Sequence, residues 1–160
     1  MKIGVISDTH GHLPNARDAA EVLRAEEVDL VIHCGDIGSV DVPPIFAEWK
    51  TYFVFGNVDR NKDELRHAIE SAGLTCCGRF GELVCEDRAI AFLHSDDSAA
   101  FSAACTSGQW DMVCYGHTHI AEHHKVGKTL VLNPGALYRA NPHTLAIVTL
   151  PQLSVRRVAV

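Results

Sequence analysis

Short apolar runs alternate with helical segments through the first half of the chain, and this alternation limits the fold more than any other sequence feature. The apolar runs are residues 2–7, 29–34 and 51–55. The helical segments are residues 14–26, 42–50 and 61–72, with prolines at the start of the first two. Repeated strand–helix–strand units predict parallel strands joined by right-handed crossovers.

The second half of the chain is richer in strand signals. Residues 82–86 and 88–93 predict a hairpin. A helix is expected at residues 97–107 and a short buried strand at residues 112–115. Further strands are expected at residues 121–126, 128–132, 144–150 and 153–158. We therefore expect one domain, residues 1–160, of the α/β class, with a parallel half packed against an antiparallel half.

The composition excludes several classes of protein. Hydrophobic residues make up 47% of the 160 residues, which is enough to build a core and excludes intrinsic disorder. Asp and Glu number 20 against 14 Lys and Arg, and the resulting formal charge of −6 disfavours binding to long nucleic acids. No apolar run approaches the roughly 20 residues that a membrane-spanning helix needs.

The start of the chain indicates a reducing compartment, and the cysteines are interpreted in that light. Strand signals begin at residue 2 without a secretory signal pattern, so we expect a cytoplasmic protein. None of the six cysteines forms a C-x-x-C pair, and we interpret them as small buried side chains rather than zinc ligands. The adjacent Cys76 and Cys77 receive no role from the sequence.

Polar clusters follow the apolar runs at the points where those runs end. The clusters are Ser7-Asp8-Thr9-His10, Gly35-Asp36, Gly56-Asn57, His94-Ser95-Asp96 and Gly116-His117-Thr118-His119. Parallel strands of one sheet end at a common edge, where open α/β proteins bind ligands. An Asp-x-His or Gly-Asp motif alone is more often a helix cap or a turn, and Gly-His-Thr-His is stronger but has chance as its alternative in a His-rich chain. Five motifs in succession favour a shared site.

Seven side chains in these clusters are candidate metal ligands: Asp8, His10, Asp36, Asn57, His94, His117 and His119. Seven are too many for one tetrahedral zinc ion, and they suit two ions that share a bridging carboxylate. Nitrogen and oxygen ligands without thiolate favour manganese, iron, zinc, nickel or cobalt over calcium or magnesium. We therefore expect two divalent transition-metal ions, with manganese first among these.

The ordered set resembles the calcineurin-like metallophosphoesterase superfamily. The residues that carry the resemblance extend from Asp8 to His119, and the turn Asn133-Pro134-Gly135 is also typical of that family. Size and layout are most similar to its small bacterial and archaeal phosphodiesterases, and a retromer subunit is a further relative. The resemblance implies a two-sheet β-sandwich flanked by helices, in four α/β/β/α layers.

The resemblance also implies a role for each candidate ligand. One ion would be held by Asp8, His10 and His119, and the other by Asn57, His94 and His117. Asp36 would bridge both ions. A hydroxide between the ions would attack phosphorus in line with the leaving oxygen, so that Asp36, Asn57 and His94 act in catalysis through it.

Two positions depart from the family's pattern. Many members have a His directly after the Gly-Asn pair, where it assists at the phosphate or the leaving group, but this chain has Val58 there. We therefore expect small phosphodiesters whose leaving groups depart readily. The family also often has His-Gly-His after the fourth strand, where this chain has His94-Ser95-Asp96.

Other polar and aromatic residues have competing interpretations. Asp59 would orient a metal ligand or pair with Arg60 at the surface. His12 and Arg139 would contact substrate, although exposure to solvent is the default for both. The remaining residues are interpreted as a packed strand residue (His33), surface residues (His123, His124) and core or interface residues (Trp49, Trp110).

These inferences predict a metal-dependent phosphodiesterase with a small phosphoester substrate. The first alternative is a phosphomonoesterase. The second is a non-catalytic interaction scaffold similar to the retromer subunit. We expect no membrane partner and no long nucleic acid, and the sequence leaves self-association into a homo-oligomer open.

Overall fold

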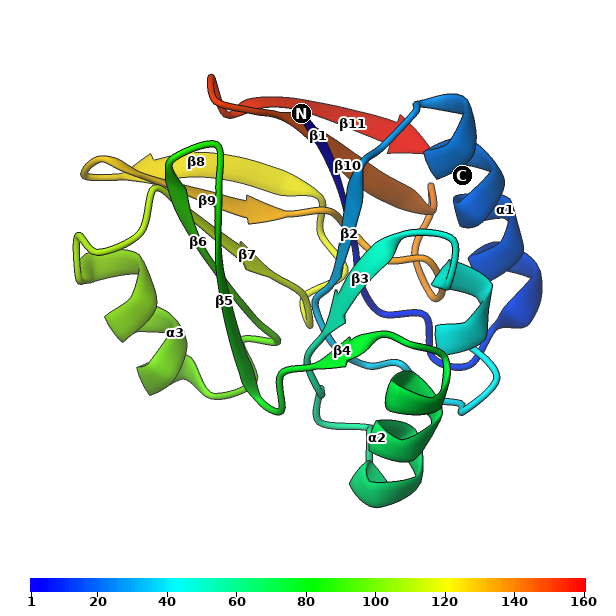
Figure 1. The fold of residues 1–160 in the computed structure, drawn as a ribbon. Coiled ribbons are helices and arrows are strands. Elements are labelled where there is room, and N and C mark those ends of the chain that lie inside the picture. The colour runs from blue at the N-terminus through cyan, green and yellow to red at the C-terminus, as the bar shows by residue number, and fades with distance from the viewer.

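Two β-sheets lie face to face at the centre of the computed structural model, which describes residues 1–160 (Figure 1). The first sheet has the order β11 (Ser154–Ala159), β10 (Thr144–Thr149), β1 (Lys2–Ile6), β2 (Leu30–His33), β3 (Lys50–Phe53) and β4 (Thr75–Cys76). The second has the order β5 (Phe80–Cys85), β6 (Arg88–Leu93), β7 (Met112–Tyr115), β9 (Thr129–Asn133) and β8 (Glu122–Val126).

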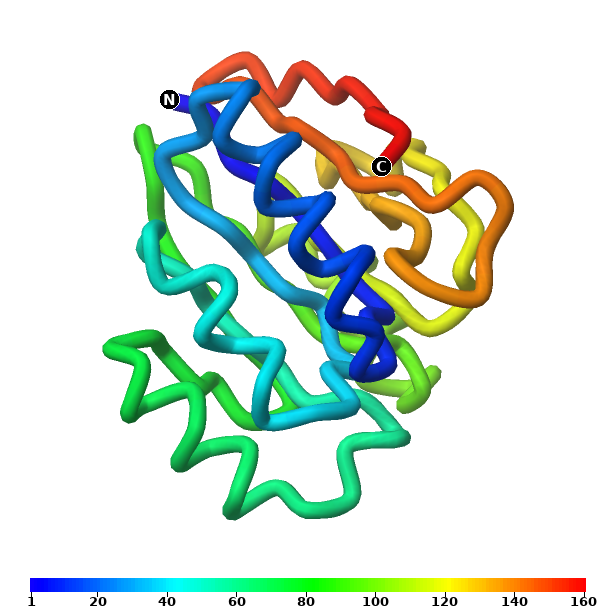
Figure 2. The backbone as a smooth tube through the Cα atoms, turned by 90° about the vertical axis from the view of Figure 1, so that its right-hand side faces the viewer, coloured from blue at the N-terminus to red at the C-terminus, as the bar shows by residue number.

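Helices cover the outer face of each sheet. The outer face of the first sheet carries α1 (Leu13–Ala25), the 3₁₀ turn η1 (Pro43–Phe46) and α2 (Lys62–Ser71), which lie in front of the sheet in Figure 2. The second sheet carries α3 (Ser98–Thr106), at the left of Figure 1. The predicted four-layer α/β/β/α sandwich is therefore confirmed.

Three apolar clusters hold these layers together. The cluster between the sheets includes Val5 and Ile32 of the first sheet and Phe92 of the second. A second cluster, with Leu23 of α1 and Ile69 of α2, joins the first sheet to its helices. A smaller one joins α3 to the second sheet. All residues of β2 are buried because both faces of the sheet are covered, which explains its continuous apolar sequence.

The prediction of a parallel half packed against an antiparallel half is wrong, because both sheets are mixed. In the second sheet, β6, β7 and β9 run parallel, and the antiparallel strands β5 and β8 form its edges. The last two strands leave this sheet, and β10 pairs antiparallel with β1 of the first. The predicted hairpin is confirmed as β5–β6.

Two short elements also differ from the expectation. Only Pro43–Phe46 of the predicted helix 42–50 is helical, as a 3₁₀ turn, and Lys50 already belongs to β3. The two-residue strand β4 was not predicted, and the adjacent cysteines Cys76 and Cys77 lie at its end. Cys76, the last residue of β4, packs against the helix-covered core, and Cys77, which follows it, packs against the core between the sheets.

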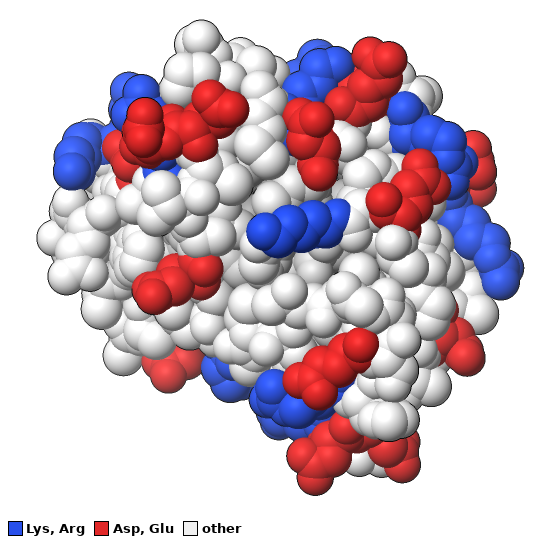
Figure 3. All heavy atoms as spheres, in the orientation of Figure 1, with Lys and Arg blue, Asp and Glu red and all other residues white.

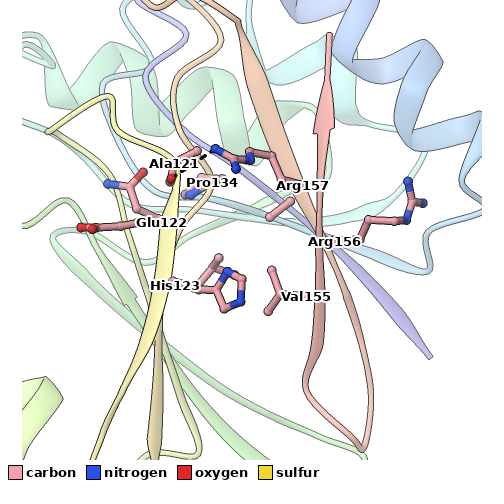
Figure 4. Close-up of a pocket in the computed structure, with 10 residues that line it drawn as sticks. Ala121, Glu122, His123, Pro134, Val155, Arg156 and Arg157 are labelled. Carbon is pink, nitrogen blue, oxygen red and sulfur yellow. Dashed lines mark hydrogen bonds between the residues drawn. The ribbon is translucent and has the colours of Figure 1, made fainter.

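The structure has a cavity away from the polar strand ends. A cavity of about 480 Å³ lies between β8 and β11, the edge strands of the two sheets, and its lining contains none of the seven candidate ligands (Figure 4). Arg157 crosses this opening and donates to the Ala121 carbonyl over 3.4 Å.

No helix of the chain combines the length and hydropathy that a membrane span requires.

Candidate metal centre

The seven candidate ligands come from the carboxyl ends of five strands. Asp8 follows β1, Asp36 follows β2, Asn57 follows β3, and His94 follows β6. His10 continues the first of these loops, and the pair His117 and His119 follows β7. Backbone hydrogen bonds extend the β1–β2 pairing into the loops, from the Asp8 amide to Gly35 O (3.0 Å) and from the His10 amide to Asp36 O (2.9 Å). The parallel pairing thus places distant sequence segments beside one another.

Asp8, His10 and His119 form the first group of ligand atoms. Asp8 Oδ1 lies 3.1 Å from His119 Nε2 and 3.8 Å from His10 Nε2. The two imidazole Nε2 atoms are 3.2 Å apart. One carboxylate oxygen and two ring nitrogens therefore converge on one small volume, as in a metal site with mixed ligands.

Asn57, His94 and His117 form the second group. Asn57 Oδ1 lies 3.1 Å from His94 Nε2 and 3.1 Å from His117 Nδ1. Asp36 stands between the groups, because its Oδ1 is 3.2 Å from His94 Nε2 and its Oδ2 is 3.7 Å from His10 Nε2. Asp8, Asp36 and His94 are buried, whereas Asn57 and His117 are exposed, so the second group opens to solvent.

Hydrogen bonds orient two of the imidazoles so that a lone pair of each faces a carboxylate. His94 Nδ1 donates to the Cys34 carbonyl (2.8 Å), and His119 Nδ1 donates to the Arg139 carbonyl (3.2 Å). Their Nε2 atoms are then acceptors in the neutral ring, and they point at Asp36 and Asp8. Asp8 Oδ1 is buried and has no hydrogen-bond partner. This convergence of acceptors fits bound cations.

At Asp36 and His94, neighbouring groups shift the pKa in the direction opposite to the effect of burial. Burial acts to raise the pKa of Asp36, but the close contact with His94 and the hydrogen bond from the Val58 amide outweigh it, so that this pKa is lowered. Burial acts to lower the pKa of His94, but the close contact with Asp36 and the charges of Asp8 and Asp36 outweigh it and raise this pKa. Burial lowers the pKa of His10, and the charge of Arg139 acts in the same direction. The carboxylates therefore attract positive charge into the site.

Strained backbone is concentrated among the candidate ligands. Eleven non-glycine residues have positive φ, and five of them are candidate ligands: Asp8 (56°), His10 (48°), Asp36 (54°), His117 (83°) and His119 (60°). A left-handed conformation costs an L-residue about 1 kcal/mol. Such strain persists where the surrounding structure enforces it, and it concentrates at functional sites.

Asp59 supports the ligand loops and is not a surface residue. Its buried carboxylate accepts hydrogen bonds from the backbone amides of Ile37 (3.2 Å), Gly38 (2.9 Å) and Gly56 (2.8 Å). These amides follow Asp36 and precede Asn57, so one side chain ties two ligand loops together. The alternative of a surface pair between Asp59 and Arg60 is wrong.

Several supporting residues were not predicted to act at the site. Ser7 donates to Asp8 Oδ2 (2.6 Å), and Asn133 Nδ2 donates to Thr118 Oγ1 (3.0 Å) between the two histidines. His33 is packed in β2 as expected, but its ring also joins two ligand loops, accepting from the Gly35 amide (3.2 Å) and contacting Thr9 Oγ1 (2.6 Å). Burial lowers the pKa of His33 to about 3, so the ring is neutral.

The other predicted residues divide between the site and the surface. His12 caps α1 by accepting from the Asn15 amide (3.3 Å), and its ring stacks on Tyr138. Arg139 lies beside His119 through its carbonyl group. His123 and His124 are exposed on β8 as expected. Trp49 is buried, in agreement with its interpretation as a core residue.

We expect Gly56→Ala to weaken metal binding by about 10-fold or more, because an added Cβ would lie 2.0 Å from Asp36 Oδ1 and 2.4 Å from the Asp36 backbone nitrogen. Gly73→Ala is the control, since its Cβ meets no atom within 4 Å, although its φ of +76° makes the substitution strained. Manganese titration monitored by calorimetry measures the difference. Unchanged affinity in Gly56→Ala would show that Asp36 is not a ligand.

Comparison with known proteins identifies the family. A family model for the calcineurin-like phosphoesterase superfamily domain matches residues 1–152. A curated phosphodiesterase of Methanocaldococcus jannaschii is 36% identical over 138 residues, which cover 84% of this chain and 83% of that protein. The solved structure of an archaeal phosphodiesterase superposes with a TM-score of 0.92 and 32% identity over 100% of both chains.

A more distant solved structure shares the fold alone. Vps29 from Entamoeba histolytica in complex with zinc superposes with a TM-score of 0.66 and 17% identity, covering 100% of this chain and 98% of that one. The first two relatives and the family model together show that the chain belongs to the calcineurin-like phosphoesterase superfamily, in its small archaeal and bacterial branch.

Proposed function

We propose that this protein is a phosphodiesterase that hydrolyses small phosphodiesters with two divalent transition-metal ions. The observation that carries this proposal is the position of Asp36, with one oxygen 3.2 Å from His94 of the second group and the other 3.7 Å from His10 of the first. Asp8, His10 and His119 would hold one ion, and Asn57, His94 and His117 the other. Manganese is the metal we favour, with iron, zinc, nickel and cobalt as alternatives.

The ions and the protein have separate tasks in this proposal. When bound, the ions lower the pKa of a water molecule and neutralise charge on the phosphoryl oxygens. The buried Asp36 carboxylate lies between the two ligand groups and would contact both ions. The carbonyls of Cys34 and Arg139 fix the ring orientations of His94 and His119. The exposed Asn57 and His117 leave an entrance for the phosphate.

We expect an aryl phosphodiester to be hydrolysed with a kcat/KM about 10-fold or more above that of the corresponding aryl phosphomonoester. Val58, next to Asn57, has no group that can assist at the phosphate or protonate a leaving oxygen, so singly charged esters with good leaving groups suit the site. Release of 4-nitrophenolate from bis(4-nitrophenyl) phosphate and from 4-nitrophenyl phosphate, with added manganese, measures both rates. A preference for the monoester would support the phosphomonoesterase alternative.

The scaffold alternative has one supporting observation, the shared fold with Vps29. It differs from the enzyme proposal in one measurable respect. A protein that contains two equivalents of metal yet hydrolyses neither ester would be assigned to a binding function.

The proposed setting is the cytoplasm, and the proposed partner is a small phosphoester. All six cysteines are free thiols, which suits a reducing compartment. Acidic and basic side chains are interspersed on the face shown in Figure 3, without a continuous basic surface for a long nucleic acid.

A further inference from the structure

We propose that Arg139 binds a non-bridging oxygen of the substrate phosphate at the rim of the metal centre, an assignment that rests on the proposed phosphoesterase function. Arg139 follows the Asn133-Pro134-Gly135 turn and belongs to neither ligand group. Its place in the fold, its backbone conformation and its unpaired charge each support this role.

The backbone around Arg139 is attached to the ligand loops on two sides. The Leu137 amide donates to the Ser7 carbonyl (3.0 Å), and the Tyr138 amide donates to the Asp8 carbonyl (3.1 Å). The Arg139 carbonyl then accepts from His119 Nδ1 (3.2 Å). Arg139 is therefore fixed beside the first ligand group, and its α-carbon cannot move without disturbing Asp8 or His119.

Arg139 has the left-handed backbone conformation that five of the candidate ligands also adopt. Its φ is 57°, in the left-handed region that glycine or asparagine adopts more readily than arginine. A residue that served only to turn the chain would be better as glycine. Positive φ also occurs in turns away from the site, for example at Leu153, so the support for the proposal comes from the strained arginine lying directly beside His119.

The side chain of Arg139 is exposed and lies on an aromatic support. Its guanidinium carbon is 5.8 Å from the centre of the Tyr138 ring. Tyr138 in turn stacks on His12, with ring centres 4.4 Å apart and planes inclined by 10°. His12 is held in place by the α1 cap. This stack gives the guanidinium a defined position over Tyr138, next to the backbone that contacts Asp8 and His119.

The charge of Arg139 has no carboxylate partner. Five other arginines of the chain form ion pairs with Asp or Glu: Arg24, Arg66, Arg79, Arg88 and Arg156. Arg139 forms none, and its carbonyl lies 3.2 Å from Nδ1 of His119, a candidate ligand. A planar guanidinium with several donors matches the oxygens of a phosphate, which the neighbouring ions would present to it.

The test compares Arg139→Ala with Arg157→Ala, a matched loss of an exposed arginine that also lacks a carboxylate partner. We expect Arg139→Ala to raise both the KM for bis(4-nitrophenyl) phosphate and the inhibition constant of inorganic phosphate by about 10-fold or more, and Arg157→Ala to change neither. Added guanidinium ion should restore part of the loss, which a merely structural role would not allow.

Arg139→Gly separates the side chain from the fold, because glycine accepts the left-handed backbone. This variant should keep the manganese content and thermal midpoint of the wild type while showing the same rise in KM. A KM and an inhibition constant within twofold of the wild type, in a folded and metal-loaded variant, would overturn the assignment.

Failure of the proposed function gives a different result. If the manganese-loaded wild type hydrolyses no phosphoester, the enzyme proposal fails. Calorimetric measurement of inorganic phosphate binding then tests whether Arg139 is a phosphate-binding residue. Weaker binding to Arg139→Ala by about 10-fold supports the assignment, and equal binding overturns it.

Discussion

Asp36→Asn should lower kcat/KM for an aryl phosphodiester by about 1,000-fold or more, a loss of roughly 4 kcal/mol of transition-state stabilisation. The reason is the position of the carboxylate between the two ligand groups, 3.2 Å from His94 Nε2 and 3.7 Å from His10 Nε2. A neutral amide cannot neutralise and bridge two cations. The initial rate with bis(4-nitrophenyl) phosphate under saturating manganese measures the effect.

The fold should survive this substitution. An asparagine oxygen can still accept the hydrogen bond that the Val58 amide donates to Asp36 Oδ1 (3.0 Å). Asp18→Asn, on the exposed face of α1, is the control and should retain full activity. Full activity of Asp36→Asn would remove the basis of the proposed mechanism.

Saturating manganese should raise the thermal midpoint of the metal-free protein by about 5–10 °C. A ligand present at about 100 times its dissociation constant stabilises the folded state by roughly 2.7 kcal/mol, provided that it does not bind the unfolded chain. For a chain of this size, 1 kcal/mol corresponds to about 2–4 °C. The physical cause is the relief of buried acceptors, above all Asp8 Oδ1, which has no hydrogen-bond partner. Differential scanning fluorimetry after chelation and readdition of metal measures the shift.

Two comparisons make this shift specific. Calcium should produce a smaller increase, because it prefers oxygen to the imidazole nitrogens that dominate the site. His94→Ala should lose most of the manganese effect, since His94 Nε2 faces both Asp36 and Asn57. An equal increase with calcium, or an unchanged increase in His94→Ala, would contradict a transition-metal site at these residues.

The sequence predicted which side chains meet, because each follows an apolar run at the carboxyl end of a strand. Asp8 and Asp36 illustrate this, since the β1–β2 pairing continues directly into their loops. The expectation of a single sheet edge is wrong, since β1, β2 and β3 belong to the first sheet and β6 and β7 to the second. The sequence could not predict the pairing partners of the later strands. Residues 144–150 have the same apolar pattern whether the strand joins the second sheet or returns to the first, as β10 does.

The sequence named Asp59 and Arg139 but could not decide between a supporting role and exposure to solvent. Asp59 interacts with backbone amides from two loops, and no side-chain pattern marks such contacts. Arg139 was a candidate from the sequence, but its positive φ and its contact with His119 come only from the structure. The roles of these supporting residues therefore follow from backbone conformation and long-range hydrogen bonds, which residue spacing in the sequence does not reveal.

The most direct test of the two-metal account is an anomalous diffraction measurement on crystals grown with manganese. The account predicts two peaks at the manganese edge, one among Asp8, His10 and His119 and one among Asn57, His94 and His117. Asp36 should contact both peaks. A single peak, or peaks away from these residues, would contradict the account.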